Sequence, residues 1–319
     1  MRLFSYPDYR HANPYQQLLY RGLSNRYTIR FRDWRGALGA TQDAAQPSIF
    51  HLHWEDAIYR TQPDAVAAKA EAQAFLTALE SAKAAGMPFL WTVHNEQPHD
   101  GRYAALHGQL AQAMSVLADW VIVHHPSAAE TVARRYSLPA ERLAIIPHGH
   151  YRDIHSPLAG DRDARREAAG YGSDDTVLLL FGRLDAYKGT AELLAAFAAL
   201  DAPGLHLVIA GKQVVPIAPL LDDLPPATRA RITVHEGFVA NTEIPGLFEC
   251  ADFVVAPYRE ISTSGTVMLA LSLGRPVIVP ALPGILEWVR GGENGLVFAS
   301  PPAADEQARV AALQATLRQ

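Results

Sequence analysis

The chain lacks the cysteines that a disulfide framework needs. Its 319 residues include a single cysteine, Cys250, which excludes an internal disulfide and is typical of a protein kept in a reducing compartment. No apolar run approaches the roughly 20 residues of a membrane span, and the first residues (MRLFSYPDYR) contain no apolar signal core. These absences predict a cytoplasmic protein without a spanning helix.

Several enzyme signatures are missing as well. No G-x-G-x-x-G follows a strand-like run, which counts against a dinucleotide-dependent oxidoreductase, and neither a P-loop nor a G-x-S-x-G elbow occurs. Thirteen histidines include three close pairs, but none has the helical spacing of H-E-x-x-H, so we expect no metal site. These pairs are His51/His53, His124/His125 and His148/His150.

Charge is unevenly distributed along the chain. Residues 1–150 hold 14 Lys and Arg against 13 Asp and Glu (+1), whereas residues 151–319 hold 14 against 20 (−6). The first 35 residues contain seven Arg and two Asp, interleaved with aromatic residues. This stretch is interpreted either as an ordinary solvated helix and strand or as a basic face that contacts an anionic membrane or a phosphorylated lipid. The overall charge of −5 disfavours a nucleic-acid partner.

Apolar runs alternate with helix-length periodic runs, which predicts an α/β fold with parallel sheets. The segment 151–175 is charged, glycine-rich and without a strand pattern, so we predict two domains, 1–155 and 156–319. The predicted strands lie at 2–6, 48–54, 89–95, 120–125, 143–149, 176–182, 205–211, 232–238, 252–258, 275–281 and 295–299, and the predicted helices of the first domain lie within 13–24, 63–86, 101–118 and 127–137.

Two strand–loop–helix units in the second half have the composition of phosphate sites. In FGRLDAYKG (181–189) an apolar run stops at Gly182, and Arg183 and Lys188 follow within one short loop before a helix-forming run. In the second unit, the strand-like run ending at Tyr258 opens into a hydroxyl- and glycine-rich turn at 262–266. Cations, hydroxyls and backbone N–H groups at a helix N-terminus hold phosphate. Two such sites predict a ligand with a diphosphate.

The motifs of the second half also occur in the order found in a known enzyme family. They are GRLDAYKG, LVIAGK, HEGFV, CADFVVAPYRE, SGTVMLALSLGRPVIVPALPGILEWV and GENGLVF, with weaker matches in HLHW, TVHN and IIPHG of the first half. With them the chain resembles the retaining GT-B glycosyltransferases of the "group 1" family, which includes polysaccharide and glycolipid sugar transferases. The resemblance implies GT-B architecture, with two Rossmann-like, doubly wound domains facing a central cleft.

The resemblance also implies roles for the donor-side residues. Arg183 and Lys188, next to Gly182, would hold the diphosphate of a nucleotide-sugar. Many family members carry two glutamates seven residues apart, and here Glu260 takes the first place while Met268 and Leu269 occupy the second. We therefore expect Glu260 to contact the donor sugar, or else to be a surface carboxylate paired with Arg259 or Arg290. The distal phosphate would bind to the turn formed by Thr263, Ser264, Gly265 and Thr266.

The acceptor side is predicted at the ends of two strands of the first domain. His94 ends the run FLWTVH and is followed by Asn95, and His53 ends the preceding strand. Family analogy places His94 beside the transferred sugar, where its ring would donate to a hydroxyl and its backbone carbonyl would face the anomeric carbon. For both histidines a satisfied core position stays open as the alternative.

The predicted function is a hexosyl transfer from a nucleoside-diphosphate sugar, GDP-mannose or a UDP-sugar, to a glycan or lipid-linked acceptor in cell-surface or exopolysaccharide assembly. The first domain would bind the acceptor and the second the donor, without metal or other cofactor, at the inner face of the membrane. Retention is the family's usual outcome, and an inverting enzyme would need a base among Glu55, Asp56, Glu96 and Asp100. The alternatives are a non-catalytic sugar-nucleotide or glycan-binding protein and a nucleotide-sugar epimerase. The short tail after residue 298 would leave few contacts for interdomain closure, unless the chain is truncated.

Overall fold

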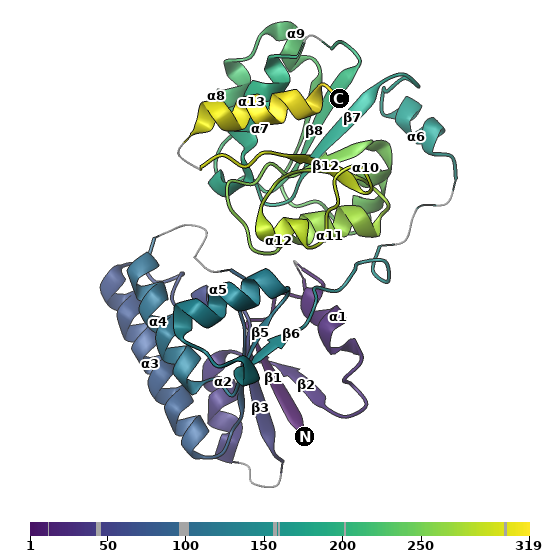
Figure 1. Ribbon diagram of the computed structural model, residues 1–319. Helices are drawn as coiled ribbons and strands as arrows, with labels where there is room; N and C mark the ends of the chain where they lie inside the picture. The colour runs from purple at the N-terminus through teal and green to yellow at the C-terminus, as the bar shows by residue number, and fades with distance from the viewer. Residues whose placement is uncertain are drawn as a thin grey trace. The chain divides into compact units, whose positions relative to one another are not determined.

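The chain forms two compact units, Met1–Gly149 and His150–Gln319 (Figure 1). Their structure is a computed structural model. Residues 150–155, which the sequence placed with the first domain, pack with the second, where the backbone N–H of Tyr151 donates to Ser272 Oγ (2.9 Å). Within the described ranges, no helix has both the length and the apolar character that a membrane crossing requires. The structure describes residues 1–11, 13–42, 46–95, 102–155, 158, 160–200, 202–302 and 305–319.

The first unit is a six-stranded parallel sheet in the order β2-β1-β3-β4-β5-β6. Because β1 pairs with β2 on one side and β3 on the other, the strand order reverses at β1, and such a reversal opens a crevice at the carboxyl ends of the strands. The strands are β1 (Arg2–Tyr6), β2 (Thr28–Phe31), β3 (Ser48–Leu52), β4 (Phe89–Thr92), β5 (Trp120–Val123) and β6 (Leu143–Ile145). The edge strand β2 was not among the predicted strands.

Helices cover both faces of this sheet, as the apolar strands require. The long helix α3 follows the predicted 63–86 run closely: Asp64 caps its start by accepting from Ala67 N (2.8 Å), and Gly86 follows its end. The helices are α1 (Tyr15–Arg21), α2 (Trp34–Leu38), α3 (Ala65–Ala84), α4 (Ala104–Leu117) and α5 (Pro126–Tyr136), with 3-10 turns η1 (Gly39–Gln42), η2 (Glu55–Ile58) and η3 (Ala140–Arg142).

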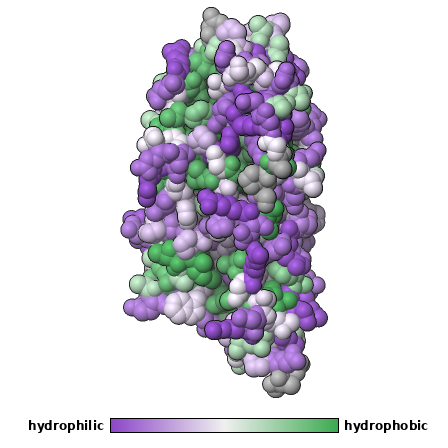
Figure 2. All heavy atoms as spheres, turned by 90° about the vertical axis from the view of Figure 1, so that its right-hand side faces the viewer, coloured by the Kyte–Doolittle hydropathy of each residue, from purple (hydrophilic) through white to green (hydrophobic). Residues whose placement is uncertain are grey.

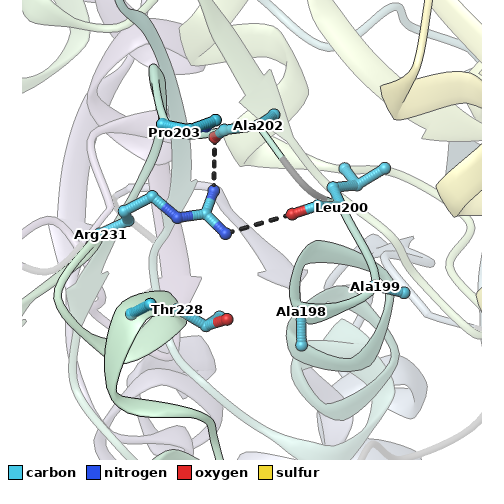
Figure 3. Close-up of a pocket in the computed structure, with 8 residues that line it drawn as sticks. Ala198, Ala199, Leu200, Ala202, Pro203, Thr228 and Arg231 are labelled. Carbon is cyan, nitrogen blue, oxygen red and sulfur yellow. Dashed lines mark hydrogen bonds between the residues drawn. The ribbon is translucent and has the colours of Figure 1, made fainter.

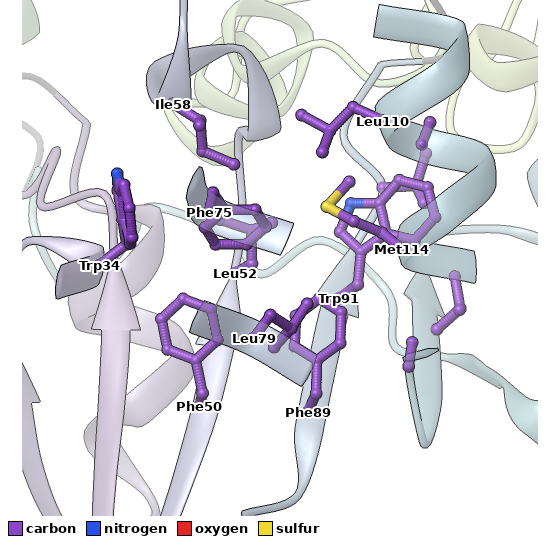
Figure 4. Close-up of a cluster of buried hydrophobic side chains, with 14 of the residues drawn as sticks. Trp34, Phe50, Leu52, Ile58, Phe75, Leu79, Phe89, Trp91, Leu110 and Met114 are labelled. Atoms are coloured by element: carbon purple, nitrogen blue, oxygen red, sulfur yellow. The ribbon is translucent and has the colours of Figure 1, made fainter. Parts of the chain in front are cut away.

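The two faces of the first sheet differ in chemistry. Side chains alternate between faces along each strand, and one set packs against α2, α3 and α4 as an apolar core (Figure 4). Its members include Trp34, Phe50, Leu52, Phe75, Phe89, Trp91, Leu110 and Met114. The opposite set ends in polar side chains at the carboxyl ends of β1, β3, β4 and β5.

The second unit is also a six-stranded parallel sheet, in the order β12-β11-β10-β7-β8-β9, and α13 packs against α7 (Figure 1). Its strands are β7 (Thr176–Phe181), β8 (Leu205–Gly211), β9 (Ile232–Glu236), β10 (Phe253–Val255), β11 (Val277–Pro280) and β12 (Gly295–Phe298). Its helices are α6 (Arg162–Ala168), α7 (Thr190–Ala198), α8 (Ala218–Asp222), α9 (Pro226–Arg229), α10 (Ile244–Cys250), α11 (Gly265–Ser272), α12 (Pro283–Leu286) and α13 (Glu306–Leu317), with the 3-10 turn η4 (Ala186–Lys188).

Candidate functional site

A buried ammonium group marks the first candidate site, at the carboxyl ends of β7 and β10. Lys188 is 4% exposed, and its Nζ donates to the Phe181 carbonyl (3.3 Å), Tyr258 Oη (3.1 Å) and Thr266 Oγ1 (3.2 Å). All three acceptors are neutral, and among the described residues no carboxylate lies within ion-pair distance of this amine. Since a buried charge without a counterion is costly, the arrangement favours a bound anion.

Glycines bring two loops together at this ammonium. Gly182 and Gly189 both have positive φ (+105° and +71°), which L-residues with a Cβ rarely adopt. A Cβ on Gly189 would collide with the Pro257 carbonyl, and one on Gly182 would lie 3.3 Å from Thr266 Oγ1 and 3.4 Å from Lys188 Nζ. Glycine at these positions therefore lets the loop after β7 approach the loop before α11.

Ser264 is the N-cap of α11, with its Oγ accepting from Val267 N (3.1 Å) and bonded to Tyr258 Oη (2.6 Å). The residue is 3% exposed. The half-buried Thr263 and Gly265 lie on either side of this capping serine, and Thr266 Oγ1 accepts from Lys188. The turn thus joins the lysine to a helix N-terminus, where backbone N–H groups and the helix dipole attract an anion.

The two predicted charged contacts of the donor sugar nucleotide lie nearer the surface. The Arg183 side chain is 51% exposed and forms an ion pair with Asp185 (3.0 Å). Glu260 is exposed, and neither arginine named as its possible partner binds it: Arg259 pairs with Glu192 (2.6 Å), and Arg290 pairs with Glu293 (3.4 Å). The alternative that Glu260 is held by these arginines is wrong.

A buried ionic group that the sequence analysis missed supports the loop carrying Glu260. Glu192 of α7 and Arg309 of α13 are each 2% exposed, and the Glu192 carboxylate accepts from Arg259 Nε (2.6 Å) and Arg309 Nε (3.3 Å). Burial opposes ionisation, but the hydrogen bond and charge of Arg259 and the charge of Arg309 hold the pKa of Glu192 below its ordinary value. The three residues of this group come from distant segments, so no pattern within a short stretch of sequence predicts it.

The polar face of the first sheet forms the second candidate site. Histidines from four segments meet there: His51 lies in β3 and His53 follows it, His94 follows β4, His124 follows β5, and His148 lies beyond β6. All five are less than 9% exposed. Two tyrosines of α1 pack edge-on against them, Tyr15 on His94 (4.9 Å between ring centroids) and Tyr20 on His53 (5.9 Å). The pair His51/His53 and one member of each of the other two close pairs thus belong to a single cluster, whereas His125 caps α5 and His150 is exposed.

His94 lies in this cluster with its ring enclosed. Its Nε2 lies 3.1 Å from His53 Nδ1, its Nδ1 lies 3.4 Å from His124 Nε2, and its ring stacks on Trp54 (4.1 Å, 12°). Donation from this ring to a sugar hydroxyl would require one of these hydrogen bonds to break. Asn95 follows it and is half-buried.

Two of the four carboxylates considered as bases are described by the structure. Glu55 is 4% exposed beneath Trp91 (3.4 Å) and His107 (3.4 Å), and burial raises its pKa to about 8. This acid is therefore mostly protonated at neutral pH. Asp56 pairs with Arg60 (3.3 Å). Glu96 and Asp100 lie outside the described residues.

A pocket of about 460 Å³ lies elsewhere in the second unit, beside the end of α7 (Figure 3). Its Arg231 donates to the carbonyls of Ala202 (2.8 Å), Leu205 (3.0 Å) and Leu200 (3.2 Å). The Arg231 guanidinium thus supplies hydrogen-bond donors to backbone carbonyls that follow the C-terminus of α7. This is a structural role. In the part of the chain that the structure describes, no group of three or more His, Cys, Asp or Glu residues is arranged to hold a metal ion.

Comparison with solved structures identifies the fold. The Anabaena protein HepE in complex with UDP-glucose superposes with a TM-score of 0.70 at 14% identity, covering 99% of this chain and 93% of HepE. Sucrose-phosphate synthase from Thermosynechococcus elongatus gives 0.68 at 17% identity, covering 100% and 90%. The predicted GT-B fold, with two Rossmann-like parallel-sheet domains, is confirmed.

Curated relatives and two family models together match most of the chain. GDP-mannose:glycolipid 4-beta-D-mannosyltransferase of Xanthomonas campestris pv. campestris is 29% identical over 269 residues, 84% of this chain and 70% of that protein. Alpha-D-kanosaminyltransferase of Streptomyces kanamyceticus is 28% identical over 67% of this chain and 60% of its own length. The model "Glycosyltransferase Family 4" matches residues 7–151, and "Glycosyl transferases group 1" matches residues 175–319. The chain therefore belongs to the group 1 glycosyltransferases of GT-B fold.

Proposed function

We propose that this glycosyltransferase moves a hexose from a nucleoside-diphosphate sugar, with GDP-mannose as the first candidate, to a glycan or lipid-linked acceptor in exopolysaccharide or cell-surface assembly. The second domain binds the donor and the first presents the acceptor. The single observation that carries the donor assignment is the buried, uncompensated ammonium of Lys188 beside the N-terminus of α11. A diphosphate supplies the missing counter-charge.

The remaining donor contacts follow from the same geometry. Arg183 binds the diphosphate either after breaking its ion pair with Asp185 or while keeping it. The backbone N–H groups of Gly265 and Thr266, in the first turn of α11, donate to the same anion. Glu260, exposed and beside this turn, contacts the hydroxyls of the donor sugar. Two cations and a helix N-terminus would stabilise the departing diphosphate without a metal ion.

A thermal-shift panel tests this function. GDP, UDP, ADP and dTDP and their common sugar derivatives would be compared with free mannose and inorganic pyrophosphate. A nucleotide at 100 times its dissociation constant adds about 2.7 kcal/mol of stability, so we expect one base to raise the melting temperature by about 5–10 °C. An unchanged melting temperature with every nucleotide would contradict the proposed function. Product analysis then separates the alternatives, because an epimerase converts the donor without acceptor and a binding protein leaves it intact.

The stereochemical course is a finer part of the proposal. We propose retention, which the family resemblance implies, because Glu55 is buried and mostly protonated and thus unsuited to serve as a base. Inversion is the alternative, since the mannosyltransferase relative is named for a β linkage and forming one from an α-linked donor inverts the anomeric carbon. The one-bond C–H coupling at the anomeric carbon of the product distinguishes the two outcomes.

We also propose that the first domain contacts anionic lipid through the arginines around β2. Arg26, Arg30 and Arg32 are exposed, and no ion pair involves them within the described residues. Figure 2 shows one face of the molecule, on which hydrophilic side chains predominate and apolar side chains lie in separate groups. Unpaired arginines contact an anionic membrane by electrostatic attraction.

Neutralising these arginines is expected to weaken vesicle binding. Each cation near an anionic surface contributes about 1 kcal/mol, so the triple change to Gln should lower the affinity for phosphatidylserine vesicles about 100-fold. Co-sedimentation measures this, with phosphatidylcholine vesicles as the neutral surface. The matched control changes Lys69, Arg134 and Arg135 to Gln. Equal losses in the two triple variants would contradict a specific contact at β2.

A further inference from the structure

A continuous chain of hydrogen bonds runs through the polar face of the first sheet. From one end, the Ile146 carbonyl lies 2.9 Å from His124 Nδ1, His124 Nε2 lies 3.4 Å from His94 Nδ1, and His94 Nε2 lies 3.1 Å from His53 Nδ1. At the other end, Tyr20 Oη lies 2.7 Å from His53 Nε2 and 2.7 Å from His51 Nδ1. Four imidazoles from three strands are thus joined to one tyrosine.

The four rings of this chain are neutral. They are 0–8% exposed, and among the described residues none forms an ion pair with a carboxylate. A charged imidazole here would be desolvated and would face other imidazoles at close range. Burial accordingly lowers the pKa of His51 to about 3 and that of His124 to about 4. A neutral imidazole carries one N–H and one lone pair.

One end of the chain decides which nitrogen carries each proton. A carbonyl oxygen only accepts, so His124 carries its proton on Nδ1 and presents a lone pair at Nε2. His94 must then donate from Nδ1 to His124 and accept at Nε2, and His53 must donate to His94 from Nδ1. The Ile146 carbonyl therefore fixes the donor-to-acceptor direction of every hydrogen bond from His124 to His53.

The same logic reaches the tyrosine. His53 Nε2 has a lone pair 2.7 Å from Tyr20 Oη, so Tyr20 donates its only proton there in preference to Ser5 Oγ, which lies farther away (3.1 Å). The Tyr20 oxygen then accepts from His51 Nδ1. His51 Nε2 then accepts from Thr92 Oγ1 (2.8 Å). Every histidine of the chain is therefore an Nδ1–H tautomer, and every member finds a partner.

We propose that His53 and His124 are positioning residues for His94 in sugar transfer: they occupy both ring nitrogens of His94 and fix it as the neutral Nδ1–H tautomer, flat against Trp54. This inference rests on the proposed function. His94 then serves the reaction as a rigidly held group at the end of β4, where its backbone borders the substrate, and its ring carries no proton to or from the sugar.

Nitrogen-15 NMR of histidine-labelled protein at pH 7.5 tests the hydrogen-bond chain in the absence of any nucleotide sugar. Long-range proton–nitrogen correlations report the tautomer of each ring, and single substitutions assign the signals. We expect Nδ1–H for His51, His53, His94 and His124. An Nε2–H or doubly protonated state at His53 or His94 overturns the proposal.

Two variants test the direction of the chain. In Tyr20→Phe, His51 loses its acceptor and is expected to switch to Nε2–H so as to donate to Thr92, whereas His94 stays Nδ1–H because His124 still anchors it. In His124→Phe the anchor is lost, and the His94 tautomer is no longer fixed. A His94 signal that changes in Tyr20→Phe but not in His124→Phe overturns the assigned direction.

Kinetics test the positioning role. With GDP-mannose, or the nucleotide sugar that the thermal panel identifies, His124→Phe should lower kcat about tenfold, the equivalent of one hydrogen bond, and leave the donor KM within about twofold. His124→Gln keeps an acceptor for His94 and should restore most of kcat. The matched control is His107→Phe, since His107 is equally buried (2%), bonds to Tyr59 (2.9 Å) and lies on the opposite face.

The outcomes separate this inference from the proposed function. Equal kcat losses in His124→Phe, His124→Gln and His107→Phe would mean a merely structural role and overturn the positioning proposal. A failure of every nucleotide to bind would overturn the proposed function while the wild-type NMR spectrum still tests the chain. The expected pattern is a tautomer change and a kcat loss that appear together in His124→Phe alone.

Discussion

Replacing Lys188 by methionine is expected to weaken donor binding about 100-fold without loss of folded protein. Methionine keeps the length and apolar stem of lysine, and it removes a charge that neutral oxygens alone surround. A buried charge without a counterion costs stability, so the unliganded variant should melt at the same temperature as the wild type or higher. A charge-assisted hydrogen bond contributes about 1.5–3 kcal/mol, and the dissociation constant for the nucleotide should rise about 100-fold.

Calorimetric titration and thermal shift together measure the two halves of this prediction. Lys69→Met, on the exposed face of α3, is the matched control for loss of a lysine and should change neither quantity. Arg183→Gln should weaken binding less, about tenfold, because this side chain is half exposed and already paired with Asp185. Undiminished nucleotide binding by Lys188→Met would show that the ammonium is a structural group and would remove the main support for the donor site.

Acid is expected to unfold the first domain well above the pH at which carboxylates titrate. Burial lowers the pKa of five clustered histidines, to about 3 for His51 and about 4 for His124, while unfolded histidine titrates near 6.5. Between these values the unfolded chain binds more protons than the folded one, so stability is full above pH 6.5 and falls as the pH drops. Each such histidine contributes a slope of about 1.4 kcal/mol per pH unit.

One group opposes this trend. The pKa of Glu55 is raised to about 8, so its stabilising contribution grows as the pH falls from 8 toward 4.5. The net slope should therefore correspond to at most four histidines, or about 8 kcal/mol between pH 6.5 and 5, which is comparable to the 5–15 kcal/mol stability of a typical domain.

Urea unfolding followed by tryptophan fluorescence between pH 8 and 4.5 measures this slope. Four of the five tryptophans, Trp34, Trp54, Trp91 and Trp120, lie in the first domain. His51→Gln should reduce the slope by about one proton. The matched control for loss of a histidine is His206→Gln, which lies in the second unit, whereas the four tryptophans report on the first. A urea midpoint that stays constant from pH 7 to 5 would contradict neutral burial of the cluster.

The secondary structure was largely predictable because its signals are local. Apolar runs bounded by glycine or proline located eleven strands that the structure contains, and α3 begins at its predicted acidic cap. The missed strand β2 is short, lies at the edge and carries arginine at Arg30, so its composition resembles a solvated loop. Its pairing with β1 depends on a partner strand about 25 residues away, which a local window does not include.

The donor-side motif was predictable for a similar reason. Gly182, Arg183 and Lys188 lie within one loop, and the hydroxyl-rich turn lies directly before α11. The sequence did not reveal that Lys188 is buried. Nor did it reveal that the Ser264 hydroxyl is already engaged, as the cap of α11 through Val267 N and in a hydrogen bond with Tyr258. Both facts depend on contact between the loops after β7 and β10.

By itself, the sequence determined the α/β pattern, the two-domain organisation and the family, because these depend on residue type, period and short-range order. Only the tertiary structure decided that His51, His53, His94, His124 and His148 form one neutral cluster, and that Glu192 joins Arg259 to Arg309. The physical reason is that a parallel sheet places the carboxyl ends of strands from distant segments side by side. Hydrogen bonds across that edge depend on strand order and register, which no single segment encodes.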